Sequence, residues 1–174
     1  GVQVYNPANG GLASRPYNAN NLFCSGQTAL PDGRILVVGG HEAVYTGIND
    51  TTIFNPTSES WSAGAPMTYG RWYPTATTLA DGKVLATSGA INCPTCNNPG
   101  GSHAGIATIP EVYDPVANTW TELASASLSL PLYPHMFLLP DGRLFVSGSQ
   151  EDPVVARALN LATQSWTVVD PTLR

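Results

Sequence analysis

Basic residues are scarce in this sequence. The 174 residues include seven lysines and arginines, of which Lys83 is the single lysine, and the formal net charge is −5. A nucleic acid is usually bound by clustered positive charge that meets its phosphate backbone, whereas these residues are scattered. No apolar run approaches the roughly 20 residues that a membrane-spanning helix needs. We therefore expect neither a nucleic acid nor a membrane as partner.

Helical periodicity is also missing. The chain has instead 17 glycines and 15 prolines, which favour turns between short strands. Hydrophobic residues make up 43% of the sequence, which is enough for the core of a folded domain of this length. The composition therefore predicts an all-β protein.

One turn motif occurs three times, as LPDGRILVVGG at 30–40, LADGKVLATSG at 79–89 and LPDGRLFVSGS at 139–149. The Asp-Gly pair is typical of a turn between two strands. The apolar run after each turn has no alternation, which indicates a strand buried on both faces. Each copy is therefore expected to be the inner hairpin of one structural repeat.

A second motif follows each hairpin and contains Trp61, Trp120 or Trp166. It reads as a strand, a turn and a second strand, so we interpret the three tryptophans as packing residues between repeats. Four strands and a period of roughly 50 residues are typical of a kelch-type β-propeller blade. The prediction is a partial propeller of about three four-stranded blades. Its parts are 1–20 (the tail of a preceding blade), 21–70, 71–130 and 131–174.

Three blades cannot close a ring, because propellers typically have four to eight. An open arc would expose a strand edge and apolar blade faces. We therefore expect the remaining blades, from another chain or segment, as a partner of this one.

The repeat also aligns three side chains that lie far apart in the sequence. Cys24, Tyr73 and Tyr133 each stand eight residues before the aspartate of their Asp-Gly turn. Equivalent positions of successive blades border the same space, so we expect the three to be neighbours. The simpler alternative is that Cys24 is a small buried hydrophobic residue and that Tyr73 is part of the core.

The segment NLFCSG, followed by MTYGRWYPTATTLADGKVLATSG, resembles the galactose oxidase and glyoxal oxidase family of copper-radical oxidases, and RWYPT favours the glyoxal oxidase branch. The resemblance implies a seven-bladed propeller. It implies that Cys24 is joined by a thioether to Tyr73, which binds copper and carries a radical, and that Tyr133 faces the site as wall or substrate contact. Small alcohols or aldehydes, and O2 reduced to H2O2, are the implied reactants.

Other features of the family have no counterpart here. Its Tyr-His ligand pair and its further copper histidine are missing, and Ile91 stands where galactose oxidase stacks a tryptophan over the thioether. His135 is out of register for a ligand, so we interpret it as structural. His41, which follows the first buried strand, is interpreted as a solvated loop residue. The chain is therefore expected to carry at most half of a copper site.

The other two cysteines, Cys93 and Cys96, lie in a long loop rich in glycine, proline and asparagine. A local disulfide is favoured. A reactive dithiol would need a helix start, and a zinc site would need two more ligands, of which His103 is one candidate. The cysteine pair, together with the glycosylation sequon at Asn49, favours a secreted, extracellular protein.

Three functions are compatible with these patterns. The favoured one is part of a secreted copper-radical oxidase. The alternatives are a non-catalytic kelch propeller that binds protein or glycan, and a scaffold fragment without activity of its own.

Overall fold

The structure is a computed structural model that describes residues 2–96, 104–149 and 153–173. Its described elements are strands apart from one 3-10 turn, η1 (Ala124–Ala126). None of the helices in these ranges has the length and apolar character of a membrane span. The fold is all-β, as predicted.

Three four-stranded antiparallel sheets follow one another along the chain. The first contains β3 (Gly26–Ala29), β4 (Ile35–Val38), β7 (Thr51–Asn55) and β8 (Ser60–Ala63). The second contains β9 (Thr75–Thr78), β10 (Val84–Thr87), β11 (Glu111–Asp114) and β12 (Thr119–Glu122). The third contains β13 (Met136–Leu138), β14 (Leu144–Val146), β15 (Val155–Asn160) and β16 (Ser165–Leu173).

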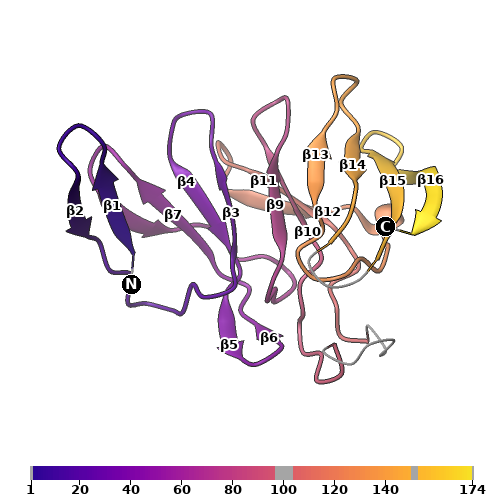
Figure 1. The fold of residues 1–174 in the computed structure, drawn as a ribbon, viewed down its shortest axis with the longest axis horizontal. Coiled ribbons are helices and arrows are strands. Elements are labelled where there is room, and N and C mark those ends of the chain that lie inside the picture. Colours follow the sequence, from indigo (N-terminus) through magenta and orange to yellow (C-terminus); the bar gives the residue numbers. More distant parts are fainter. Residues whose placement is uncertain (1, 97–103, 150–152, 174) are drawn as a thin grey trace.

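The strands of each sheet pair in chain order, as in a propeller blade. Figure 1 shows the three sheets side by side in chain order, with the two-stranded sheet of β1 (Gln3–Asn6) and β2 (Gly11–Ser14) beyond the first. They do not close into a ring within the described residues, and the need for further blades stays a prediction.

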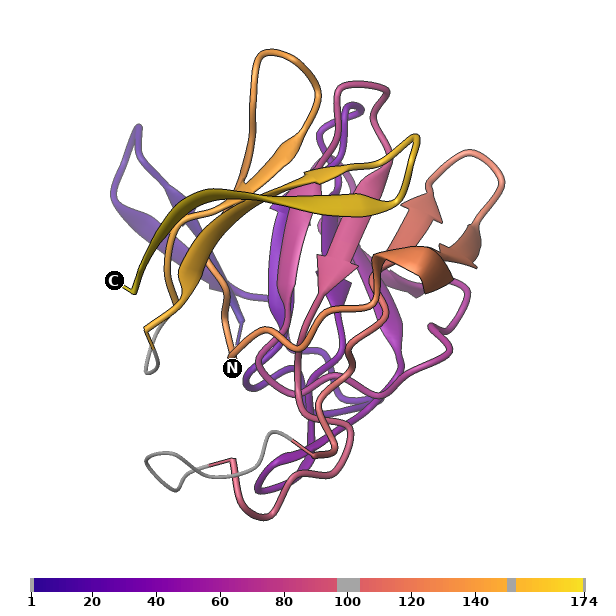
Figure 2. The ribbon, with the colours of Figure 1, turned by 90° about the vertical axis from the view of Figure 1, so that its right-hand side faces the viewer.

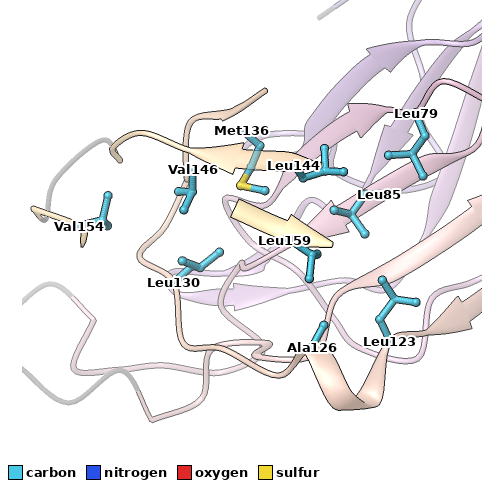
Figure 3. Close-up of a cluster of buried hydrophobic side chains, with 10 residues drawn as sticks. All are labelled: Leu79, Leu85, Leu123, Ala126, Leu130, Met136, Leu144, Val146, Val154 and Leu159. Carbon is cyan, nitrogen blue, oxygen red and sulfur yellow. The ribbon is translucent and has the colours of Figure 1, made fainter. Parts of the chain in front are cut away.

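The core lies between neighbouring sheets. In β10, Leu85 packs toward the third sheet, whereas Val84 and Ala86 pack toward the first. Side chains alternate between the two faces of a strand, so a strand covered by a sheet on each face needs apolar residues at every position. Figure 3 shows the cluster between the second and third sheets, where Leu85 lies near Leu144 and Leu159. The unbroken apolar runs of the repeat therefore belong to the central strands.

The three repeated tryptophans connect each sheet to the part of the chain before it. The indole N–H of Trp61 donates to the Arg15 carbonyl at 2.9 Å. Trp120 donates to the Ala65 carbonyl at 3.0 Å, and Trp166 donates to Ala126 at 2.8 Å. The expected packing role is confirmed, and each tryptophan also supplies a hydrogen bond across the junction.

Two connections project beyond the sheets at the same end of the molecule. One is the hairpin of β5 (His41–Ala43) and β6 (Thr46–Gly47), and the other is the described part of the loop after β10, residues 88–96 and 104–110 (Figures 1 and 2). They contact each other through a bridge between Thr46 and Asn92. This end of the molecule carries the residues discussed next.

Candidate functional site

The three residues that share the repeat register are neighbours in the structure. The Tyr73 N–H donates to the Cys24 carbonyl at 2.8 Å, and the Tyr133 N–H donates to the Tyr73 carbonyl at 2.9 Å. A line of backbone hydrogen bonds thus crosses from the first sheet to the third, just before the innermost strands begin. The count of eight residues to each turn therefore identified positions that meet in space.

All three residues have the same unusual backbone conformation. Their φ angles are 63° at Cys24, 63° at Tyr73 and 46° at Tyr133. The left-handed region is uncommon for residues other than glycine, and strained conformations of this kind cluster at functional sites. The three positions therefore share a backbone conformation as well as a register.

The side chains meet as well. The Cys24 side chain belongs to a buried cluster against which the Tyr73 side chain packs. The rings of Tyr73 and Tyr133 are stacked, with centroids 4.5 Å apart and planes 18° apart. The Tyr133 hydroxyl donates to the Ser25 carbonyl at 3.2 Å. The sulfur of Cys24 and two phenols therefore form one cluster.

Burial keeps two of these groups protonated. It raises the pKa of the Cys24 thiol above its usual value, an effect that the hydrogen bond from Tyr73 partly offsets. It also raises the pKa of Tyr133 to about 12, with a further contribution from the nearby Cys24. At neutral pH the site therefore holds a thiol beside a neutral Tyr133 phenol.

A tryptophan covers the other face of the Tyr73 ring. Trp72 stacks on it with centroids 3.9 Å apart and planes 8° apart, and its side chain is buried. Sequence counting identified Ile91 as the corresponding position. Ile91 instead contributes backbone hydrogen bonds to Gly47 and Gly105. In the sequence, the feature that could have identified Trp72 was its position directly before Tyr73.

Comparisons with known proteins agree with the repeated four-stranded sheets. A model of the kelch motif matches residues 24–68. A galactose oxidase of Gibberella zeae is 28% identical over 127 residues, which cover 72% of this chain and 16% of the relative. The chain thus contains a kelch motif and is similar in sequence to galactose oxidase over most of its length. A "WSC domain-containing protein" of Arthroderma benhamiae is 29% identical over 140 residues, which cover 73% of the chain and 14% of that relative. The chain thus spans about one sixth of the length of these relatives.

A fully buried ion pair supports the segment that carries Trp72 and Tyr73. Arg71 Nη2 donates to Glu111 Oε2 at 2.7 Å, and both side chains are 0% exposed. Its guanidinium also donates to the carbonyls of Ser88 at 2.6 Å and Ile109 at 2.8 Å. The pair is isolated from solvent, so its role is to fix the backbone next to the site.

A glycine packs directly against the same segment. A Cβ on Gly47 would lie 2.2 Å from both the Arg71 carbonyl carbon and the Trp72 nitrogen. Only a residue without a side chain permits this approach. The hairpin β5–β6 is therefore held against the backbone that carries the stacked rings.

Cys93 and Cys96 form a disulfide in the structure, with an S–S distance of 2.06 Å. Both are buried in one cluster with Cys24 and Trp72, and the Cys93 N–H donates to the Tyr45 carbonyl at 2.9 Å. The disulfide loop thus forms part of the wall behind the stacked rings. His103, the candidate zinc ligand, lies outside the described residues.

The two other histidines differ from each other. His41 is half-buried, and its Nδ1 accepts the Trp72 indole N–H at 3.0 Å, which differs from the expectation of a solvated loop residue. His135 is exposed, and its backbone pairs with Gly148 and Ser147. His41 therefore belongs to the surroundings of the site, and His135 belongs to the hairpin of the third sheet.

The donors present fit part of a copper site. A tyrosine oxygen is a suitable ligand for Cu(II), and a metal ion lowers the pKa of a ligand that it binds. Tyr73 supplies such an oxygen beside the Cys24 sulfur. Within residues 2–96, 104–149 and 153–173, no group of three or more His, Cys, Asp and Glu side chains is arranged to hold a metal. The described part of the chain thus offers a tyrosine oxygen that could serve as one ligand, and no complete ligand set.

Proposed function

We propose that this chain forms the thioether half of the active site of a secreted copper-radical oxidase. The observation that carries the proposal is the contact between Cys24 and Tyr73, two residues 49 positions apart in the sequence that share one backbone register. A packing role alone would not require a thiol to meet a phenol at strained positions of neighbouring blades. The sequence similarity to galactose oxidase supports the same assignment.

In this proposal Cys24 and Tyr73 become one cofactor. A thioether between the sulfur and the phenol ring spreads an unpaired electron over both groups, so one-electron oxidation of Tyr73 becomes easier. When bound, copper would supply a second one-electron couple next to this group. Together they can take two electrons from a primary alcohol or an aldehyde hydrate and pass them to O2, which gives H2O2.

The neighbouring rings protect this cofactor. Trp72 covers one face of Tyr73 and Tyr133 covers the other, so water is kept from both faces of the ring. The Tyr133 phenol stays protonated because its pKa is near 12. With its hydroxyl donating to the Ser25 carbonyl, it lines the site as a wall or substrate contact.

The missing copper ligands would come from further blades, supplied by another segment or chain. The motif RWYPT, with Trp72 in place, favours a glyoxal oxidase-like substrate range of small aldehydes and alcohols. The secreted location in this proposal is supported by the disulfide Cys93–Cys96, because disulfides persist in oxidising compartments.

The test is peroxide production by the intact, copper-loaded protein with glyoxal-type aldehydes and primary alcohols. Tyr73→Phe should abolish it and leave the unfolding midpoint close to that of the wild type, because the ring and its stacking remain. Tyr5→Phe, which changes a tyrosine that is 60% exposed, is the matched control and should retain activity. Undiminished peroxide production by Tyr73→Phe would refute the proposal and favour a non-catalytic propeller.

A further inference from the structure

The residues directly before Cys24 and Tyr73 converge on one histidine. The Phe23 ring lies edge-on to the His41 ring, with centroids 5.7 Å apart and planes 73° apart. From the other side, the Trp72 indole N–H donates to His41 Nδ1 at 3.0 Å. His41 thus bridges the two chain segments that present the thiol and the phenol.

His41 is itself held in place. Its backbone N–H donates to the Asn21 carbonyl at 2.8 Å, two residues before Phe23. It begins strand β5, whose hairpin packs on the Trp72 backbone through Gly47. The indole nitrogen of tryptophan can only donate a hydrogen bond, so Nδ1 is the acceptor and the ring orientation is defined. A fixed imidazole therefore determines where the Trp72 ring lies.

The position of Trp72 in turn determines the plane of Tyr73. The Trp72 and Tyr73 rings are almost parallel, with centroids 3.9 Å apart. The Tyr45 ring packs against Trp72 in an edge-on arrangement, with centroids 4.8 Å apart. Without the hydrogen bond to His41, the polar N–H of a buried indole would lack its partner. Such an unpaired group favours a different orientation of the ring, because burying it without a hydrogen bond costs free energy.

We propose that His41 is a positioning residue that aligns the Cys24 thiol with the Tyr73 ring for formation of the thioether, by holding Trp72 stacked on that ring. This inference rests on the proposed function, because it assigns a purpose to the contact between sulfur and phenol. His41 touches neither reacting atom and acts through Trp72 and Phe23.

The reaction that it assists is an oxidation. A C–S bond forms between Cys24 and the Tyr73 ring, and the S–H bond and one ring C–H bond break. The two protons and two electrons pass to O2, which becomes H2O2, with copper as the mediator that the proposed function already requires. The rate of such a step depends on how often sulfur and ring carbon are correctly oriented.

The test compares three variants of the intact protein. His41→Leu removes the acceptor and keeps an apolar side chain, whereas His41→Asn keeps an acceptor oxygen near the place of Nδ1. His135→Leu is the control, because His135 is an exposed histidine outside the site. The first measurement is made on metal-free protein and follows Trp72 by near-ultraviolet circular dichroism and acrylamide quenching, with Trp72→Phe as the background.

His41→Leu should weaken the dichroism of the stacked rings and make Trp72 more accessible to the quencher, and the other two variants should match the wild type. The second measurement is the rate of cross-linking after copper and O2 are added, followed by mass. Loss of one neutral hydrogen bond predicts a rate between about twofold and about tenfold lower in His41→Leu. His41→Asn should recover most of the rate.

An unchanged metal-free signal in His41→Leu would overturn the proposal, since Trp72 would then hold its place without the histidine. A changed signal with an unchanged cross-linking rate would also overturn it, because the position of Trp72 would not matter for the reaction. If the wild type itself forms no cross-link, the proposed function fails. The metal-free signal would still decide whether His41 holds Trp72.

Discussion

Replacing Arg71 by methionine is expected to destabilise the protein strongly. The substitution keeps most of the side-chain volume but removes the positive charge and every hydrogen bond of the guanidinium. Glu111 would remain as a carboxylate that is 0% exposed, without its positively charged partner and with the Thr68 N–H as a remaining donor. The carbonyls of Ser88 and Ile109 would lose their guanidinium donors. The change therefore tests whether this ion pair supports the segment that carries the site.

The magnitude follows from the burial of the pair. Breaking a buried ion pair by removing one partner costs about 3 to 5 kcal/mol, because the remaining charge is left without compensation. The total stability of a domain is about 5 to 15 kcal/mol, so the loss is a large fraction of it. Burial lowers the pKa of Arg71, and Glu111 opposes this shift, which is why removal of either partner is unfavourable.

The assay is urea unfolding of the intact protein, followed by circular dichroism. Arg143→Met is the matched control, because Arg143 forms an ion pair with Asp141 in which both side chains are largely exposed. This control should leave the midpoint unchanged, because exposed pairs contribute little. If Arg71→Met lowers the free energy of unfolding by less than about 1 kcal/mol, the reasoning is refuted. A buried carboxylate without its ion-pair partner should cost more free energy than that.

Three further predictions concern single positions. Tyr133→Phe should remove one late-titrating phenol from the alkaline ultraviolet titration, because the pKa of Tyr133 is about 12; an unchanged titration curve would contradict this. Gly47→Ala should destabilise the folded protein by about 1 to 3 kcal/mol, since the added Cβ would overlap the Trp72 backbone nitrogen. An unfolding midpoint equal to that of the wild type would argue against this tight packing. Trp120→Phe removes the indole N–H, which donates to the Thr51 hydroxyl of the first sheet and to the Ala65 carbonyl. It should lower stability by roughly 1 kcal/mol, measured by thermal unfolding, whereas no loss would show that ring packing alone holds the junction.

The register of the site was predictable because the repeat constrains it. The Asp-Gly turn marks the end of the innermost strand of each blade, and the strand length is nearly constant. A count from the turn therefore identified Cys24, Tyr73 and Tyr133 as neighbours, and their backbone hydrogen bonds agree. The unbroken apolar runs likewise predicted strands with a sheet on each face, as β10 shows.

The surroundings of the site were not predictable in the same way. The stacking of Trp72 on Tyr73 depends on side-chain rotation within the sequence Trp-Tyr, which strand periodicity does not describe. The roles of His41 and Glu111 depend on contacts across 31 and 40 positions. No repeat relates these residues, so only the packed structure brings them together.

The central claim is that Cys24 and Tyr73 form one covalent cofactor. The most direct measurement is peptide mass spectrometry of the reduced, intact protein after exposure to copper and O2. The account predicts that the peptides of Cys24 and Tyr73 are joined, with a mass lower by two hydrogens than their sum. Two separate peptides from fully copper-loaded protein would contradict it.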